Sequence, residues 1–174
     1  GSSFGAAAAY SGTYAEAVTG SIIMGSAFVP GGPFTAKLRE PLKSEAFQTF
    51  VKLAGRGARI DVDLTFDLDE DYGLEGAGEM KHADPWNTWS YDLASWASVI
   101  TYDPVVPIAE NKKPILFVGG EKDPTFPPDV IKATAAAIAG PVECKIMADA
   151  THQMMIYHTE DFSNIVEEFV SKYI

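Results

Sequence analysis

The chain has 174 residues, of which 47% are hydrophobic, and this is enough for one domain with a substantial core. Its 13 basic and 24 acidic residues give a formal net charge of −11, which argues against nucleic acid as the main partner. The sequence holds no run of 18 or more apolar residues, so we expect no membrane span.

Cys144 is the only cysteine, which excludes an internal disulfide, and we expect it to be a buried structural thiol. We see no signal peptide and expect a cytoplasmic location.

The chain opens on Gly1-Ser2-Ser3-Phe4-Gly5, which matches the G-x-S-x-G pattern of a nucleophile elbow. Such an elbow is a sharp turn from a strand to a helix, and its glycines stand where Cβ atoms would crowd a strained backbone. An Ala-rich helix from residue 6 and an apolar strand at 21–26, expected to be buried on both faces, follow in the order that such a serine requires. Taken alone, the pentapeptide is equally compatible with a Ser/Gly-rich turn or a tag-cleavage remnant.

The middle of the chain is less regular. Residues 29–33 interrupt regular structure, and residues 41–54 have the apolar spacing of a helix that Gly55 is placed to end. Residues 61–85 are acidic and weakly periodic, which predicts an irregular excursion over the surface. An aromatic cluster follows and includes all three tryptophans: Trp86, Trp89, Tyr91, Trp96 and Tyr102. Core packing is the simpler interpretation, and the alternative is that Trp86, Trp89 and Trp96 line an acyl-binding pocket.

Strands and helices alternate in the last third. A continuous apolar run at 115–119 predicts a buried parallel strand. A helix from Pro127 to Ala139 and a second strand at 142–147 follow it. The last helix begins at Thr159 and has apolar residues at three- and four-residue steps. This order predicts right-handed βαβ units in a parallel sheet.

Two polar side chains follow the ends of these strands. Asp123 comes just after the first strand, and His152 just after the second. Because ligands bind beyond the carboxyl ends of strands in open α/β sheets, both should face the edge where Ser3 lies. The chain order Ser3, Asp123, His152 fits a triad in which His152 takes the serine proton and Asp123 orients the imidazole. The backbone N–H of Phe4, the residue after the nucleophile, would then contribute to an oxyanion hole.

Each of these residues also has a simpler interpretation. Asp123 would cap the turn before a proline, and His152 would be a polar loop residue. His82 and His158 are the competing histidines, and Asp103 is the competing acid; for these we expect solvated, capping or turn roles. The histidines are scattered and lack the spacing of metal ligands, so we expect no metal and no cofactor.

From Gly1 to Ile174 the chain resembles the C-terminal half of an α/β hydrolase, most of all the dienelactone-hydrolase-like and X-Pro-peptidase-like group. The resemblance lies in residues 1–5, in TYDPVVPI at 101–108, in KKPILFVGGEKD at 112–123 and in ATHQMMIY at 150–157. It implies a partial α/β-hydrolase fold, with a mostly parallel sheet, flanking helices and a lid-like insertion at about 30–110. It also implies a serine nucleophile at Ser3, with Asp123 and His152 completing the triad.

The family's early strands, the strand that leads into the elbow and the oxyanion loop would all precede Gly1. We therefore expect an N-terminal segment or a second chain to complete the sheet, and we expect no activity from this chain alone. The function expected is that of a serine hydrolase that cleaves an ester, thioester or lactone of a small acyl substrate through an acyl-enzyme on Ser3. An acyltransferase on the same scaffold and a non-catalytic binding module are the alternatives.

Overall fold

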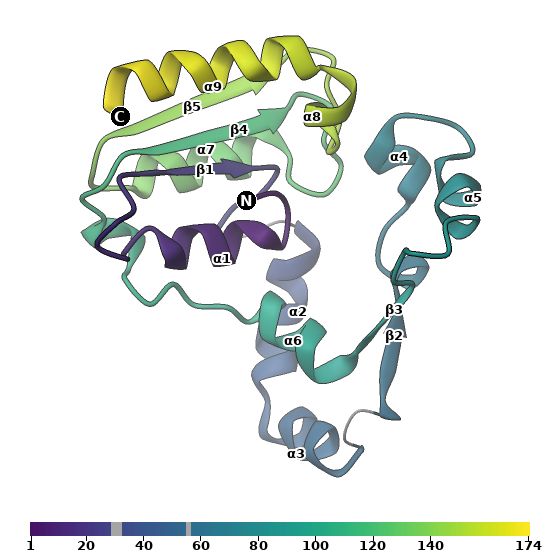
Figure 1. The fold of residues 1–174 in the computed structure, drawn as a ribbon. Helices are drawn as coiled ribbons and strands as arrows, with labels where there is room; N and C mark the ends of the chain where they lie inside the picture. The colour runs from purple at the N-terminus through teal and green to yellow at the C-terminus, as the bar shows by residue number, and fades with distance from the viewer. Residues whose placement is uncertain (29–32, 55–56) are drawn as a thin grey trace. The chain divides into compact units, whose positions relative to one another are not determined.

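The computed structural model describes residues 1–28, 33–54 and 57–174, apart from the side chains of residues 33–35 (Figure 1). The predicted helix end at Gly55 and most of the predicted interruption at 29–33 lie outside the described residues. The chain divides into two units, Gly1–Gly32 with Asp103–Ile174, and Pro33–Tyr102. The second unit lies within the insertion predicted at about 30–110, and its role as a lid stays a prediction.

The first unit is built on a parallel sheet, as the sequence predicts. Within the described residues its strand order is β1-β4-β5, formed by β1 (Ser21–Met24), β4 (Ile115–Gly120) and β5 (Val142–Met147). The first residues of the chain also pair with β1, through a parallel bridge between Ser2 and Met24. The carboxyl ends of all these segments therefore meet at one edge of the sheet.

One face of the sheet is covered by α1 (Gly5–Gly12) and α7 (Pro128–Ala137). Ile115 and Phe117 of β4 belong to the core cluster on this face, and neither is exposed to solvent. The cluster also contains residues of both helices, because their apolar sides turn toward the sheet. α7 ends before the predicted Ala139, since the backbone is already extended at residue 138.

The opposite face is covered by α8 (Met154–Tyr157) and α9 (Thr159–Tyr173) (Figure 1). Leu116 and Val118 of β4 belong to the cluster on this face, so successive side chains of β4 enter opposite cores. The sequence predicted β4, β5 and α9 but not α8, a single turn too short to show periodicity. The strand predicted at 21–26 ends at Met24 and is fully buried on one face only, because Ile22 and Met24 are partly buried where they pack against the second cluster.

The second unit has its own small core, in which buried residues of α2 and α6 meet. Its regular elements are α2 (Pro33–Lys43), α3 (Glu45–Ala54), β2 (Arg59–Asp61), η2 (Val62–Leu64), α4 (Leu68–Tyr72), α5 (Ala77–His82), β3 (Ser90–Asp92) and α6 (Leu93–Ile100). Strands β2 and β3 pair antiparallel. One further short element, η3 (Ile108–Glu110), belongs to the first unit. None of the helices in the described part of the chain combines the length and the hydropathy that crossing a bilayer requires.

Two predictions for this region were wrong. The single helix predicted at 41–54 is divided at Ser44, whose hydroxyl accepts the N–H of Phe47 at 3.3 Å and so caps the start of α3. The excursion at 61–85 contains two short helices instead of irregular structure. Asp67 caps the first of them by accepting two backbone N–H groups, and Gly73 ends it with φ of 65°.

We predict that Val118→Ala destabilises the first unit by about 2–3 kcal/mol, because it removes two buried methyl groups and leaves a cavity. Val118 is fully buried, whereas Val105 in the same unit is 82% exposed. The matched variant Val105→Ala should change the free energy of unfolding by less than about 0.5 kcal/mol. Urea unfolding followed by circular dichroism measures both, and equal values for the two variants would contradict the assignment of β4 to the core.

Candidate active site

Asp123 and His152 form a buried hydrogen-bonded pair. Nδ1 of His152 lies 2.8 Å from Oδ2 of Asp123, and the two side chains are 3% and 0% exposed. Asp123 lies in the loop after β4, and His152 in the loop after β5. The two strands are neighbours and parallel, so their following loops meet at the same edge, as the sequence indicated.

The other oxygen of Asp123 holds the loop in which it lies. Oδ1 accepts the backbone N–H groups of Thr125 at 2.9 Å and Phe126 at 2.8 Å. Capping a turn and binding a histidine are therefore not alternatives for Asp123, because each function uses its own oxygen. An ionised carboxylate can only accept hydrogen bonds, so it favours the tautomer in which Nδ1 of His152 donates and Nε2 keeps a lone pair.

The two loops are in direct backbone contact. The N–H of Lys122 donates to the carbonyl of Ala150 at 2.9 Å. Gly120 is buried at the end of β4, and a Cβ atom there would overlap the carbonyl oxygens of Ala150 and Thr151. A glycine is needed at this position because no side chain fits between the strand end and the histidine loop.

An exposed ion pair joins the same loops on their outer side. Nζ of Lys122 lies 2.7 Å from Oδ1 of Asp149, and the N–H of Asp149 donates to Oε2 of Glu121 at 3.0 Å. The hydrogen bond between the two side chains raises the pKa of Lys122 and lowers the pKa of Asp149. Since both groups are largely exposed, we expect this ion pair to add little to stability.

Ser3 lies at a turn with left-handed backbone, in which φ is +50°. Its N–H donates to the carbonyl of Met24 at 2.9 Å, which places it at the carboxyl end of β1. A Cβ on Gly1 would contact the carbonyl oxygen of Gly5 and lie 2.7 Å from Cβ of Ala9, so the first glycine of the pentapeptide is needed for close packing. The same expectation was wrong for Gly5, around which the space is open.

Phe4 follows Ser3 and precedes the first turn of α1. Its backbone has right-handed helical angles, with φ of −60° and ψ of −29°. Ser3 and Phe4 therefore stand at the N-terminal end of a helix, where the helix dipole favours negative charge. This is the position in which developing negative charge on a bound group would be stabilised.

The three tryptophans have three different environments. Trp86 is 91% exposed, whereas Trp96 is buried in the core of the second unit. The ring of Trp89 stacks on His82, with the centroids 3.7 Å apart and the planes at 10°. Core packing thus describes Trp96 alone, and the prediction that all three line an acyl-binding pocket stays untested.

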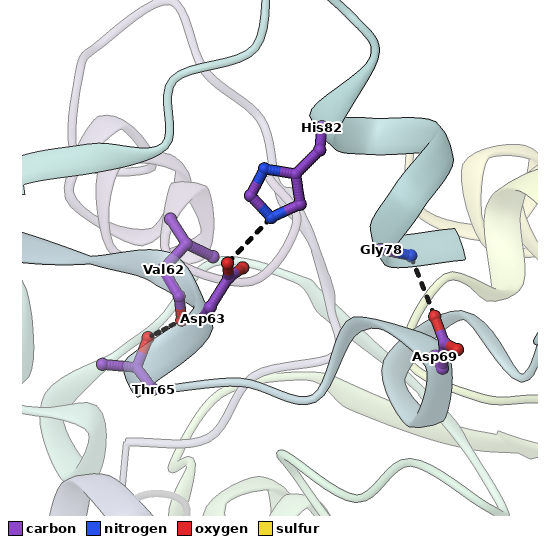
Figure 2. A network of polar contacts seen from close by, with 6 residues as sticks. All are labelled: Val62, Asp63, Thr65, Asp69, Gly78 and His82. Carbon is purple, nitrogen blue, oxygen red and sulfur yellow. Dashed lines mark hydrogen bonds and ion pairs between the residues drawn. The ribbon is translucent and has the colours of Figure 1, made fainter. Parts of the chain in front are cut away.

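The competing histidines lie in other surroundings. Nε2 of His82 lies 2.8 Å from Oδ2 of Asp63 (Figure 2). Both residues line a pocket of about 530 Å³ in the second unit. Both side chains are about half exposed. His158 lies between α8 and α9. Its backbone N–H donates to the carbonyl of Met154, and its backbone carbonyl accepts the N–H of Phe162.

Within the described ranges, no group of three His, Cys, Asp or Glu side chains is arranged to hold a metal ion. Cys144 lies in β5 and is half-buried, less than the sequence suggested. Burial raises the pKa of its thiol, which disfavours the reactive thiolate.

The polar network of the second unit yields a prediction on pH. Asp69 accepts the backbone N–H of Gly78 at 2.8 Å (Figure 2). It also accepts the backbone N–H of Gly76 at 2.9 Å, and the two bonds lower its pKa. A lowered pKa means that the stabilisation is present above the ordinary value and is lost as pH falls through the lowered one. We expect the turn between α4 and α5 to loosen below about pH 4, and in Asp69→Ala already at neutral pH.

Amide hydrogen exchange of Gly76 and Gly78, expressed as protection relative to a free peptide, measures this loosening. The control is Glu70→Ala, an exposed carboxylate on the same helix. Unchanged protection in Asp69→Ala would show that the carboxylate does not hold the turn.

The model of the alpha/beta hydrolase family matches residues 1–165. Among solved structures, a monoglyceride lipase from Saccharomyces cerevisiae is 14% identical and covers all of this chain, with a TM-score of 0.67. Esterases from Thermogutta terrifontis and Exiguobacterium antarcticum are 18% and 17% identical, cover 99% and 98% of the chain, and have TM-scores of 0.60 and 0.59.

The chain spans 61%, 64% and 65% of the lengths of these three structures. A comparison with curated proteins found no match. The structural likeness shows the fold, and the family model covers all but the last residues. The chain therefore belongs to the alpha/beta hydrolase family.

Proposed function

We propose that the protein is a serine hydrolase that cleaves an ester, thioester or lactone through an acyl-enzyme on Ser3. The observation that carries the proposal is the buried hydrogen bond between His152 and Asp123, at the sheet edge to which Ser3 also belongs. A histidine oriented by a carboxylate is the base that a serine hydroxyl needs, because the hydroxyl is a weak nucleophile until its proton is accepted.

The proposed reaction has two halves, the formation of an acyl-enzyme and its hydrolysis, and Ser3, His152 and Asp123 take part in both. Ser3 Oγ attacks the carbonyl carbon while His152 Nε2 takes the hydroxyl proton, and Asp123 stabilises the resulting imidazolium. The N–H of Phe4 and the N-terminal end of α1 stabilise the oxyanion. His152 then gives the proton to the leaving group, and water, activated by the same imidazole, hydrolyses the acyl-enzyme and restores Ser3.

The solved structures of similar fold support a reaction at an acyl carbon, since their names describe a monoglyceride lipase and esterases. Their low identity leaves the substrate to be argued from this chain. The segments at 112–123 and 150–157 resemble the dienelactone-hydrolase-like and X-Pro-peptidase-like group, and we propose that branch for the chain. Product analysis in the presence of a small alcohol tests whether water accepts the acyl group from Ser3. A hydrolase would form mainly the free acid, whereas an acyltransferase would form an ester of the added alcohol.

Ser3→Ala should abolish covalent labelling of the intact protein by a fluorophosphonate, because the reagent reacts with an activated serine hydroxyl. Intact-protein mass spectrometry measures the added mass, and peptide mapping locates it. The matched control is Ser2→Ala, whose hydroxyl lies one residue away and has no role in the mechanism. Labelling that persists in a folded Ser3→Ala variant would contradict the assignment of Ser3 as the nucleophile.

Asp123→Asn should lower kcat by about 10⁴-fold, because the amide no longer fixes the imidazole tautomer. Asp103→Asn is the control, since Asp103 is an exposed aspartate that also precedes a proline. Hydrolysis of a chromogenic ester by the intact protein measures both variants. A loss of similar size in Asp103→Asn would argue against Asp123 as the acid of the triad.

A further inference from the structure

Gly25 follows the last residue of β1 and has left-handed backbone, with φ of +48°. It is buried, and its N–H donates to the carbonyl of Val118 in β4 at 2.9 Å. This hydrogen bond ties the residue to the central strand of the sheet, so its position is fixed by the sheet and not by a free loop.

A side chain on Gly25 would point toward the Asp123–His152 pair. A Cβ built there would lie 3.0 Å from both Cε1 and Nδ1 of His152 and 3.4 Å from Oδ2 of Asp123. Contacts between carbon atoms are most favourable at about 3.5–4.0 Å, so one added methyl would press on the imidazole. His152 has little space in which to yield, because its side chain is 3% exposed and the ring of Phe126 stacks near it at 6.1 Å.

Gly25 is also one residue from the hydrogen bond that holds Ser3. The N–H of Ser3 donates to the carbonyl of Met24, the preceding residue. The short segment from Met24 to Gly25 thus contacts the serine through its backbone and the histidine and aspartate through its empty Cβ position. A change in this segment would therefore act both on the turn that holds Ser3 and on the ring of His152.

We infer that Gly25 is a positioning residue, whose missing side chain seats the imidazole of His152 at the distance that proton transfer from Ser3 requires. The inference rests on the proposed function, in which His152 is the base for Ser3. It concerns geometry alone, since Gly25 itself neither touches substrate nor moves a proton. A displacement of about 1 Å in such a site can lower the rate by about 10²-fold.

The test is Gly25→Ala in the intact protein, with Gly76→Ala as the matched control. Gly76 also has left-handed backbone, with φ of +82°, but the space around its missing Cβ is open. Both variants strain the backbone, so both should lower the melting temperature by roughly 2–8 °C, with the larger loss in Gly25→Ala because its Cβ is also crowded. Only Gly25→Ala brings a methyl group against the His152 ring.

We expect Gly25→Ala to lower the rate constant of fluorophosphonate labelling and kcat for a chromogenic ester by about 10- to 100-fold, with KM nearly unchanged. Gly76→Ala should keep the wild-type rates. Equal rates in the two variants would overturn the inference, as would a loss in Gly25→Ala that appears in KM alone, because a displaced base slows the chemical step.

A second measurement does not depend on activity. The imidazole ¹H and ¹⁵N signals of His152 should shift in Gly25→Ala and stay in place in Gly76→Ala. If the wild type is not labelled at Ser3, the proposed function fails, while unshifted His152 signals in Gly25→Ala overturn the positioning role separately. Should Gly25→Ala be unfolded at the assay temperature, the two variants and the wild type are compared at a lower temperature, at which Gly25→Ala is folded by circular dichroism.

Discussion

The structure of the site depends on keeping a carboxylate and an imidazole together out of water. A buried polar group is costly unless its hydrogen-bonding capacity is used, and a buried charge more so. Asp123 meets this requirement with two backbone N–H groups on one oxygen and His152 on the other. Because the two backbone donors belong to the loop of Asp123 itself, this loop orients the carboxylate independently of His152. The loop after β5 places Nδ1 of His152 on the second oxygen, Oδ2.

That position is available because the strands leave room for it. Backbone atoms of the loop after β5 pass directly over Gly120, and the imidazole lies against Gly25, so two strand ends that carry no Cβ surround the pair. Gly119 has a related role inside the core, since a Cβ there would overlap the Ile131 side chain of α7. The apolar faces of the sheet supply the stability, and the glycines at its edge supply the close approach that the polar pair needs.

Sequence alone predicted the parts of this arrangement that local patterns encode. The apolar runs of β4 and β5 predict buried strands, and the rule that sites lie beyond strand ends then singles out Asp123 and His152. The same patterns failed for α4, α5 and α8, because helices of four to six residues contain too few turns to show a period. The contact of Gly25 with His152 joins segments far apart in the chain, so no local signal could have predicted it.

Two histidine–aspartate pairs in this chain show why distance alone does not identify a catalytic pair. Both have a nitrogen 2.8 Å from a carboxylate oxygen. Water surrounds half of His82 and Asp63, so it screens their attraction and lets the side chains move. Around His152 and Asp123 water is excluded and further groups hold both partners, so under the proposed function little reorganisation would accompany a charge on the ring. The two pairs share their chemistry, and it is the buried surroundings of the second that support the proposal that His152 acts as an oriented base.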